Sequence, residues 1–408
     1  MLHSMLALAL LAAPPLRLSA LLEDAHQRNP ELQAAEAQAQ AAASSVSPAG
    51  ALDDPLLMVQ YWNGPVDFSV VPIMIQLTQT FPLGGKRGAR EDAAAGEALA
   101  ARADAARRRL DLDREVSELY AALYVADRSL VVHDEVLGVL RTLRSVAAAR
   151  VSSGRTEVVD QLKAQAELLK EEAAHETLVA ERTAALASLA ALLDRDPEEL
   201  QGQTEEPEAG PTLGPDAELV ARALERRPEL QASAGMISAA DARIRLSKAA
   251  GVPDITPLVA YMHTFGMQSP NNFLFLGLQT NLPIFGGSKI EPAVAAARSR
   301  LQAAQALQRS LRNRIGAEVR TAAARVRAEQ QLVEIQRRLV PIARQALDSS
   351  VSAYSAGRIG LLTVLDSARE SLMRQIDLAE HQAMAERRRA ELDRALGAAA
   401  AGKVEAPR

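Results

Sequence analysis

Two short segments contain residue types that could carry out chemistry. The pair His175-Glu176 could begin the H-E-x-x-H motif of zinc proteases, but the residue four positions after His175 is Val179 rather than a second histidine. The segment Gly84-Gly85-Lys86-Arg87 contains the Gly-Lys pair of a phosphate-binding loop, but it lacks the glycine spacing and the final hydroxyl residue of that motif. We therefore predict neither a zinc-protease site nor a phosphate-binding loop.

Soft metal ligands gather in one further place, where Met262, His263 and Met267 lie close together in the sequence. Thioether and imidazole groups can bind a copper-type cation, but filling of a strand is the more common role of such residues. The serines have no neighbouring His/Asp pattern, and the carboxylates are spaced as on solvated helix faces. The sequence therefore predicts no catalytic residue, no cofactor and no metal site, and the protein is not expected to be an enzyme.

The composition excludes several other classes of protein. The chain has 408 residues, a net charge of -5 and no long basic run, so we expect no nucleic-acid partner. Only 3% of the residues are aromatic, and many are alanine, which suits closely packed long helices. Cysteine is absent, which excludes disulfides, thiolate metal sites and an N-terminal lipidated cysteine.

The strongest pattern in the chain is an internal repeat. Apolar residues recur every seven positions, and adding 203 to the first set gives the second: Val116, Leu123, Leu130 and Leu137, then Val319, Val326, Val333 and Val340. The same shift carries Gly154-Arg155 onto Gly357-Arg358. A shared offset across these features indicates two tandem copies of one structural unit. We place repeat 1 at 19–215 and repeat 2 at 216–397.

Each repeat contains one predicted β-hairpin, at about 55–82 and at about 254–283. Apolar side chains alternate with others along the second strand of each hairpin, which is the period of a strand. The strands are roughly ten residues long, enough to cross an outer membrane when tilted. We predict that one set faces lipid (Ile73, Ile75, Leu77, Leu274, Leu276, Leu278) and that another faces water (Gln76, Thr78, Gln279, Asn281).

Long helices are predicted around these hairpins. No proline lies between Lys86 and Gly154, so one helix of roughly 100 Å can form there, and its heptads favour coiled-coil packing. His133 lies in the heptad seam and is expected to be packed or interhelical. Breaks near residues 154 and 357 form two tips, and returning helices follow at about 156–200 and 360–397. Further helices are predicted at 19–47 and 216–250, and a proline- and acid-rich linker at 197–215.

The two ends of the chain are predicted to lie outside the repeats. An apolar run from Met5 to Ala13 has the length of a signal-peptide core, and we assign residues 1–18 to a signal peptide. The alternatives are a start codon inside a longer signal and a frayed amphipathic terminus. Residues 398–408 are predicted to be a disordered tail. No other run of 18 or more apolar residues occurs, so the chain is not expected to span a membrane with helices.

Four strands cannot close a barrel, and an open sheet edge in lipid leaves backbone groups unpaired. The chain must therefore form an oligomer. Three copies would give twelve strands and two copies would give eight, and both are permitted even numbers. Eight strands barely enclose their own side chains, so a conduit favours the trimer.

The order of these segments resembles the TolC family of outer-membrane efflux proteins. The resemblance rests on two repeats, each with a helix bearing a P-E-L triplet, a hairpin ending in proline, glycine and lysine, a long helix, a glycine-marked tip and a returning helix. It covers about residues 19–397. The segment Thr80–Arg87 is most similar to the heavy-metal branch, the CzcC- and CusC-like channels.

The resemblance implies a mostly α fold with a small β part, assembled as a homotrimer. A 12-stranded β-barrel in outer-membrane lipid would continue into a trimeric α-barrel of long periplasmic coiled-coil helices. The tips would dock on a periplasmic adaptor (membrane fusion) protein that is bound to an inner-membrane RND pump. The matching tip residues are Gly154, Arg155, Val158, Gly357, Arg358, Leu361 and Leu362. Asp160 and Asp366 match the gate of the family in residue type only.

The resulting hypothesis is a passive trimeric export duct of a tripartite RND-type efflux system, for heavy-metal cations or small toxic compounds. The duct would lie in the bacterial outer membrane and extend into the periplasm. One alternative keeps the duct but assigns it to type I protein secretion. A second alternative is a soluble periplasmic coiled-coil adaptor or scaffold, which would not need two hairpins of lipid-spanning length.

Overall fold

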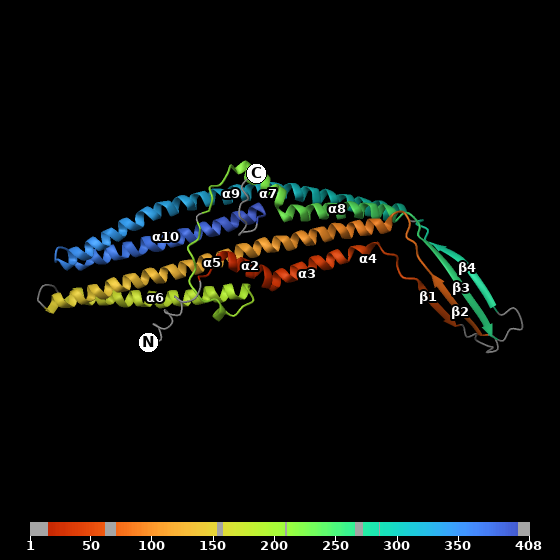
Figure 1. Cartoon of the computed structure of the whole chain (residues 1–408). Helices are drawn as coiled ribbons and strands as arrows, with labels where there is room; N and C mark the ends of the chain where they lie inside the picture. The colour runs from red at the N-terminus through yellow and green to blue at the C-terminus, as the bar shows by residue number, and fades with distance from the viewer. Residues whose placement is uncertain are drawn as a thin grey trace. The chain divides into compact units, whose positions relative to one another are not determined.

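The computed structural model describes residues 15–61, 71–152, 158–208, 210–265, 272–284 and 286–398. The described residues are mostly helical, with one small antiparallel sheet (Figure 1). None of their helices is long and apolar enough to cross a membrane. They form two compact units. The helical unit comprises Met1–Ala34, Arg107–Arg227 and Arg314–Arg408, and the sheet unit comprises Ala35–Ala106 and Pro228–Asn313. Each unit takes segments from both predicted repeats.

The sheet contains four strands in the order β1-β2-β3-β4, and every neighbouring pair is antiparallel (Figure 1). The strands are β1 (Leu56–Tyr61), β2 (Val71–Thr78), β3 (Ile255–Phe265) and β4 (Asn272–Thr280). The first two lie within the predicted hairpin at 55–82, and the last two lie within that at 254–283. The central pair, β2 and β3, joins one predicted repeat to the other. No described strand pairs with the outer edge of β1 or of β4.

Helices of the sheet unit pack through small residues. Its helical segments come from α3 (Pro30–Ser44), α4 (Val46–Gly50), α5 (Lys86–Ser152), α8 (Pro228–Ala249) and α9 (Gly286–Ser355). Where α5 meets α8, a Cβ atom added to Gly96 would lie 2.5 Å from the carbonyl oxygen of Gly235. Only a residue without a side chain permits this close approach of two backbones. An ion pair between Arg245 and Asp92, at 2.7 Å, joins the same helices.

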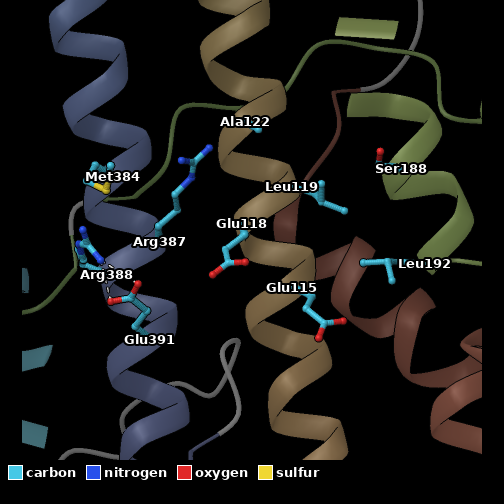
Figure 2. A pocket seen from close by; sticks show the side chains of 10 residues that line it. All are labelled: Glu115, Glu118, Leu119, Ala122, Ser188, Leu192, Met384, Arg387, Arg388 and Glu391. Atoms are coloured by element: carbon cyan, nitrogen blue, oxygen red, sulfur yellow. Dashed lines mark hydrogen bonds and ion pairs between the residues drawn. The ribbon is translucent and has the colours of Figure 1, made fainter. Parts of the chain in front are cut away.

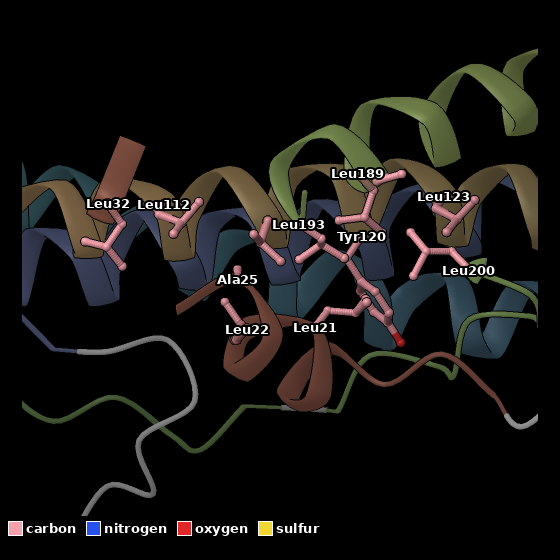
Figure 3. Packing of buried hydrophobic residues seen from close by; sticks show 12 residues of the cluster. Leu21, Leu22, Ala25, Leu32, Leu112, Tyr120, Leu123, Leu189, Leu193 and Leu200 are labelled. Carbon is pink, nitrogen blue, oxygen red and sulfur yellow. The ribbon is translucent and has the colours of Figure 1, made fainter. Parts of the chain in front are cut away.

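The helical unit contains α2 (Leu18–Arg28), α6 (Val158–Leu192), the 3-10 turn η1 (Pro197–Glu199), α7 (Asp216–Arg226) and α10 (Leu361–Leu396), together with the remaining parts of α3, α5 and α9. Figure 3 shows one of its cores, where Leu21 and Leu22 of α2 pack with Leu112 and Leu123 of α5 and with Leu189 of α6. The predicted heptad residues are mostly buried: Val116, Leu123, Leu137, Val319, Val326 and Val333. This burial confirms the predicted packing seams.

His133 is buried as predicted and lies between two helices. Its Nδ1 atom is 2.9 Å from Oε2 of Glu171, so α5 meets α6 there. Neither atom has an aligned hydrogen-bond partner, so the contact is a close approach of the imidazole to the carboxylate rather than a well-directed hydrogen bond. The histidine therefore has a packing role.

Two predicted single helices are wrong in detail, because each is broken before its P-E-L triplet. The first break occurs at Asn29, whose side chain accepts a hydrogen bond from the Leu32 backbone N–H at 2.9 Å and donates to the carbonyl of Leu192 at 2.9 Å. The second break occurs at Arg227, which is buried and donates to Glu318 at 3.0 Å. A residue that precedes proline disfavours the α conformation, so the chain turns and a new helix begins at the proline.

Residues just before α2 are part of the fold. The backbone N–H of Leu16 donates to the carbonyl of Gln203 at 2.8 Å, and the hydroxyl of Tyr120 donates to the Leu16 carbonyl at 3.1 Å. Arg17 pairs with Glu205 at 2.9 Å. A leader that ended at residue 18 would remove these contacts. The remaining leader residues, 1–14, and the predicted tail from residue 399 onward lie outside the described residues.

Candidate channel surfaces and tips

The register of the sheet gathers the predicted lipid-facing residues on one face. Directly opposite residues in neighbouring strands point to the same side of a sheet, and successive residues alternate. Ile75 lies opposite Tyr261, which in turn lies opposite Leu274. The resulting apolar face includes Leu57, Val59, Tyr61, Ile73, Ile75, Leu77, Val259, Tyr261, Leu274, Leu276 and Leu278, and it also carries His263, Asn272 and Thr280. Leu276 is 76% exposed, so the described residues leave this face uncovered at that position of β4.

The opposite face of the sheet, here called the mixed face, carries Gln76, Thr78 and Gln279 of the predicted water-facing set. Its other members include Leu56, Met58, Gln60, Met74, Leu258, Ala260, Met262, Thr264, Phe273 and Phe275. Asn281 lies beyond the end of β4, where its Oδ1 atom accepts a hydrogen bond from the Asp254 backbone N–H at 2.6 Å. The alternation of the sequence thus separates the two sets, except for this capping residue.

The group of Met262, His263 and Met267 does not form a common site. Met262 lies on the mixed face, whereas His263 lies on the apolar face, where Nδ1 is 2.8 Å from Oδ1 of Asn272. Met267 lies outside the described residues. No group of three or more His, Cys, Asp or Glu residues in the described part of the chain could hold a metal ion.

Lys86, for which the sequence predicts no phosphate-binding role, connects the sheet to the helices of the same unit. Lys86 is the first residue of α5, and its Nζ atom lies 2.6 Å from Oδ1 of Asp254 and 2.7 Å from the carbonyl oxygen of Val252. Its repeat counterpart, Lys289, is exposed. The shared lysine at an offset of 203 was a usable signal, but the partner is visible only in three dimensions.

The tip between α9 and α10 is a tight left-handed turn. Gly357 has φ +78, its N–H donates to the Tyr354 carbonyl at 2.8 Å, and the N–H of Arg358 donates to the Ala353 carbonyl at 2.9 Å. This pair of hydrogen bonds is the Schellman arrangement that ends a helix at glycine. The guanidinium of Arg150 lies 4.9 Å from the centre of the Tyr354 ring, so α5 meets α9 at this tip.

The predicted tip residues differ in their exposure. Leu361 is only 1% exposed and packs in a core with Leu365 and Val364, so its side chain stabilises the turn instead of facing a partner. Leu362 and Val158, by contrast, are 56% and 58% exposed. Arg358 is exposed as well. Gly154 and Arg155 lie outside the described residues.

Charged residues above the tips link helices to one another. Arg369 of α10 donates two hydrogen bonds to the carboxylate of Glu167 on α6, at 2.9 and 2.7 Å. These hydrogen bonds lower the pKa of Glu167. Of the two gate candidates, Asp366 has a 74% exposed side chain that lies 3.7 Å from Arg369, and Asp160 lies half-buried in the first turn of α6.

A groove of about 740 Å³ in the helical unit lies between α5, α6 and α10 (Figure 2). Glu115 and Glu118 approach it from α5, while Arg387, Arg388 and Glu391 approach it from α10. Arg388 pairs with Glu391 at 2.8 Å on the same helix. Ser188 also lines the groove, but its hydroxyl donates to the Ala184 carbonyl and to no general base. The groove therefore offers no constellation for catalysis.

A two-faced sheet, long helices and a glycine-marked tip fit an outer-membrane channel, and the chain belongs to the outer membrane efflux protein family. The match to this family covers residues 21–195 and 219–398. The chain is an outer-membrane efflux protein rather than an enzyme, and the alternative of a soluble periplasmic adaptor or scaffold is wrong.

Individual relatives agree with this assignment. The cobalt-zinc-cadmium resistance protein CzcC of Cupriavidus metallidurans is 27% identical over 370 residues, which cover 88% of this chain and 84% of that protein. The nickel-cobalt-cadmium resistance protein NccC of Alcaligenes xylosoxydans xylosoxydans is 25% identical, over 62% of this chain and 56% of that protein. The solved structure of CusC has a TM-score of 0.80 at 18% identity, over 93% of this chain and 92% of that one. The fold prediction of a TolC-like chain is thus confirmed.

Proposed function

We propose that three copies of this chain form a passive channel in the outer membrane, as one component of a tripartite RND-type efflux system. Each copy would supply four strands to a 12-stranded barrel, and its long helices to a trimeric α-barrel that extends into the periplasm. The observation that carries the proposal is the two-faced sheet, which has an exposed apolar face and two edges that no strand among the described residues pairs with.

The sheet edges give the energetic reason for assembly. Each unpaired backbone group in lipid costs several kcal/mol, so the free edges of β1 and β4 are unstable in a single copy. Pairing β4 of one copy with β1 of the next removes both edges when the ring closes. Twelve strands leave a lumen, whereas eight barely enclose their own side chains. The apolar face would then contact lipid, and the mixed face would line the lumen.

The tips support a proposed contact with a periplasmic adaptor, which would connect the channel to an inner-membrane RND pump. Exposed Val158, Arg358 and Leu362 offer both apolar and cationic contacts. We include Gly154 and Arg155 in the proposed contact because they are the repeat equivalents of Gly357 and Arg358. Gly357 is included because it shapes the turn. Leu361 would act indirectly, because it is buried. Asp160 and Asp366 are the carboxylates that we propose for a gate.

Heavy-metal cations are the proposed cargo. The proposal rests on CzcC and NccC, whose names describe resistance to cobalt, cadmium and, respectively, zinc or nickel. Small toxic compounds are the wider class. The energy for export would come from the inner-membrane pump.

Labelling of single cysteines tests the orientation of the sheet, and the natural chain offers a background without cysteine. We expect a water-soluble maleimide to label Gln76→Cys and Thr78→Cys in outer-membrane vesicles. Ile75→Cys and Leu276→Cys should resist this reagent and react with a lipid-soluble one. Lipid accessibility at positions 76 and 78 would overturn the assigned faces.

A deletion strain tests the cargo. We expect loss of the gene to sensitise cells to cobalt, zinc and cadmium, and the intact gene to restore tolerance. Unchanged metal tolerance together with loss of a secreted protein would favour type I protein secretion instead.

Gentle extraction followed by cross-linking tests the trimer. Recovery of the mature protein as a monomer would contradict it.

A further inference from the structure

The methionines of the sheet all lie on one face. Among the described strand residues these are Met58, Met74 and Met262, and the register places all three on the mixed face and none on the apolar face. Met74 and Met262 are direct partners across the central strand pair. Met58 lies opposite Gln76, so it is the diagonal neighbour of Met74. Side chains at direct positions are about 5 Å apart at Cβ, and diagonal ones remain within reach of long side chains.

Other cation-attracting groups flank these thioethers. Gln60 lies opposite Met74 on β1, and Phe273 lies opposite Met262 on β4, so one row crosses the sheet from an amide through two sulfurs to an aromatic ring. The ring centres of Phe273 and Phe275 are 6.4 Å apart. Amide oxygens and the faces of aromatic rings both attract cations.

The three methionines are not the only apolar residues of the mixed face, which also carries Leu56, Leu258 and Phe275. Burial of apolar surface therefore does not distinguish them from their neighbours. A thioether nevertheless differs from leucine in one respect, since its sulfur is a soft ligand that selects soft cations such as Cu⁺.

We propose that Met74 and Met262, with Met58 beside them, form a weak binding site for a soft monovalent cation such as Ag⁺ or Cu⁺ on the inner surface of the channel. This inference rests on the proposed function, because it requires the mixed face to line the lumen. Passage requires that the cation leave as readily as it enters. Two or three neutral thioethers meet this need, because they hold a cation without the charge of a thiolate.

The test uses full-length protein purified in detergent, with Ag⁺ alone as the probe. Methyl NMR of ¹³C-methionine-labelled protein should show Ag⁺-dependent shifts at Met58, Met74 and Met262. Combining Met74→Leu with Met262→Leu should weaken Ag⁺ binding by about tenfold or more in calorimetry. Leucine conserves the volume, so the fold should be unchanged.

Met236→Leu is the matched control, because Met236 is a 49% exposed methionine on α8. It should leave Ag⁺ binding unchanged. Equal shifts at Met236 and at the sheet methionines, or unchanged affinity in the double variant, would overturn the inference. Those results leave the cysteine labelling intact, so failure of this site is distinguishable from failure of the proposed channel.

Discussion

The ammonium group of Lys86 lies 2.6 Å from the carboxylate of Asp254, and the two residues belong to different predicted repeats. The lysine side chain is 8% exposed and the aspartate side chain is 27% exposed. Asp254 also accepts a hydrogen bond from the Leu83 backbone N–H at 3.2 Å. The pair therefore connects the start of α5 to the residue that precedes β3, where sheet and helices of one unit meet.

Lys86→Met should destabilise the protein by roughly 3 kcal/mol, because it leaves a partly buried carboxylate without its counter-charge. The loss should appear in urea unfolding of the purified protein followed by helical circular dichroism. Lys289→Met is the matched control, since Lys289 occupies the equivalent repeat position but is exposed. Equal losses of unfolding free energy in the two variants would show that the contact of Lys86 with Asp254 does not stabilise the protein.

Gly96→Ala should destabilise the protein by about 1–3 kcal/mol, because the added methyl would overlap the Gly235 carbonyl and push α5 from α8. Gly88→Ala provides a control on the same helix. A Cβ atom at Gly88 meets nothing within 4 Å, so helix propensity alone should stabilise that variant by about 0.5–1 kcal/mol. Changes of opposite sign in the unfolding free energies of the two variants would support the close packing of α5 against α8. An unchanged unfolding free energy in Gly96→Ala would contradict it.

Local periodicity accounts for what the sequence could predict. The period of two located the strands and separated Ile75 from Gln76, and the heptads located buried seam residues such as Val116. Both patterns are carried by near neighbours in the chain. The breaks at Asn29 and Arg227 were also readable in principle, because each precedes a proline, but the apolar periodicity continues across them and concealed the change of direction.

Contacts between distant segments were beyond sequence reasoning. Pairing of β2 with β3 decides that Met74 meets Met262, and neither hairpin alone contains this information. Burial at the tip is a similar case. Leu361 and Leu362 are adjacent and chemically identical, yet only the first packs in a core, because a helical turn assigns neighbours to different faces.

Gly357→Val should abolish export while leaving the amount of protein in the outer membrane unchanged. A β-branched residue is strained at φ +78, and its Cβ atom would lie 3.0 Å from Nη2 of Arg150. Gly360→Val is the control, because Gly360 has an extended backbone and open space around it. Metal tolerance of cells carrying each variant is the measurement, and full tolerance with Gly357→Val would argue against a role of this turn.

The mature protein should begin at or before Leu16. Leu16 pairs with the segment around Thr204, and the Tyr120 hydroxyl bonds to its carbonyl, so cleavage after residue 18 would leave these partners exposed. Mass spectrometry of the protein extracted from outer membranes would identify the first residue. An N-terminus after Leu16 would contradict the prediction.

Asp393 should make the protein less stable as the pH rises from about 4 to 7. Burial is the main cause that raises the pKa of Asp393 from 3.8 to about 7, Arg389 opposes the shift, and Glu386 and Asp113 add to it. The folded protein thus holds a proton that the unfolded chain releases in this range, so its stability falls until the folded-state pKa is passed.

Asp393→Asn should therefore stabilise the folded protein by about 1–3 kcal/mol at pH 8 and by little at pH 4. Asp366→Asn, at a 74% exposed side chain, is the control and should change neither value. Urea unfolding at both pH values measures the difference, and an equal effect of Asp393→Asn at pH 4 and pH 8 would assign the change to packing instead of to ionisation.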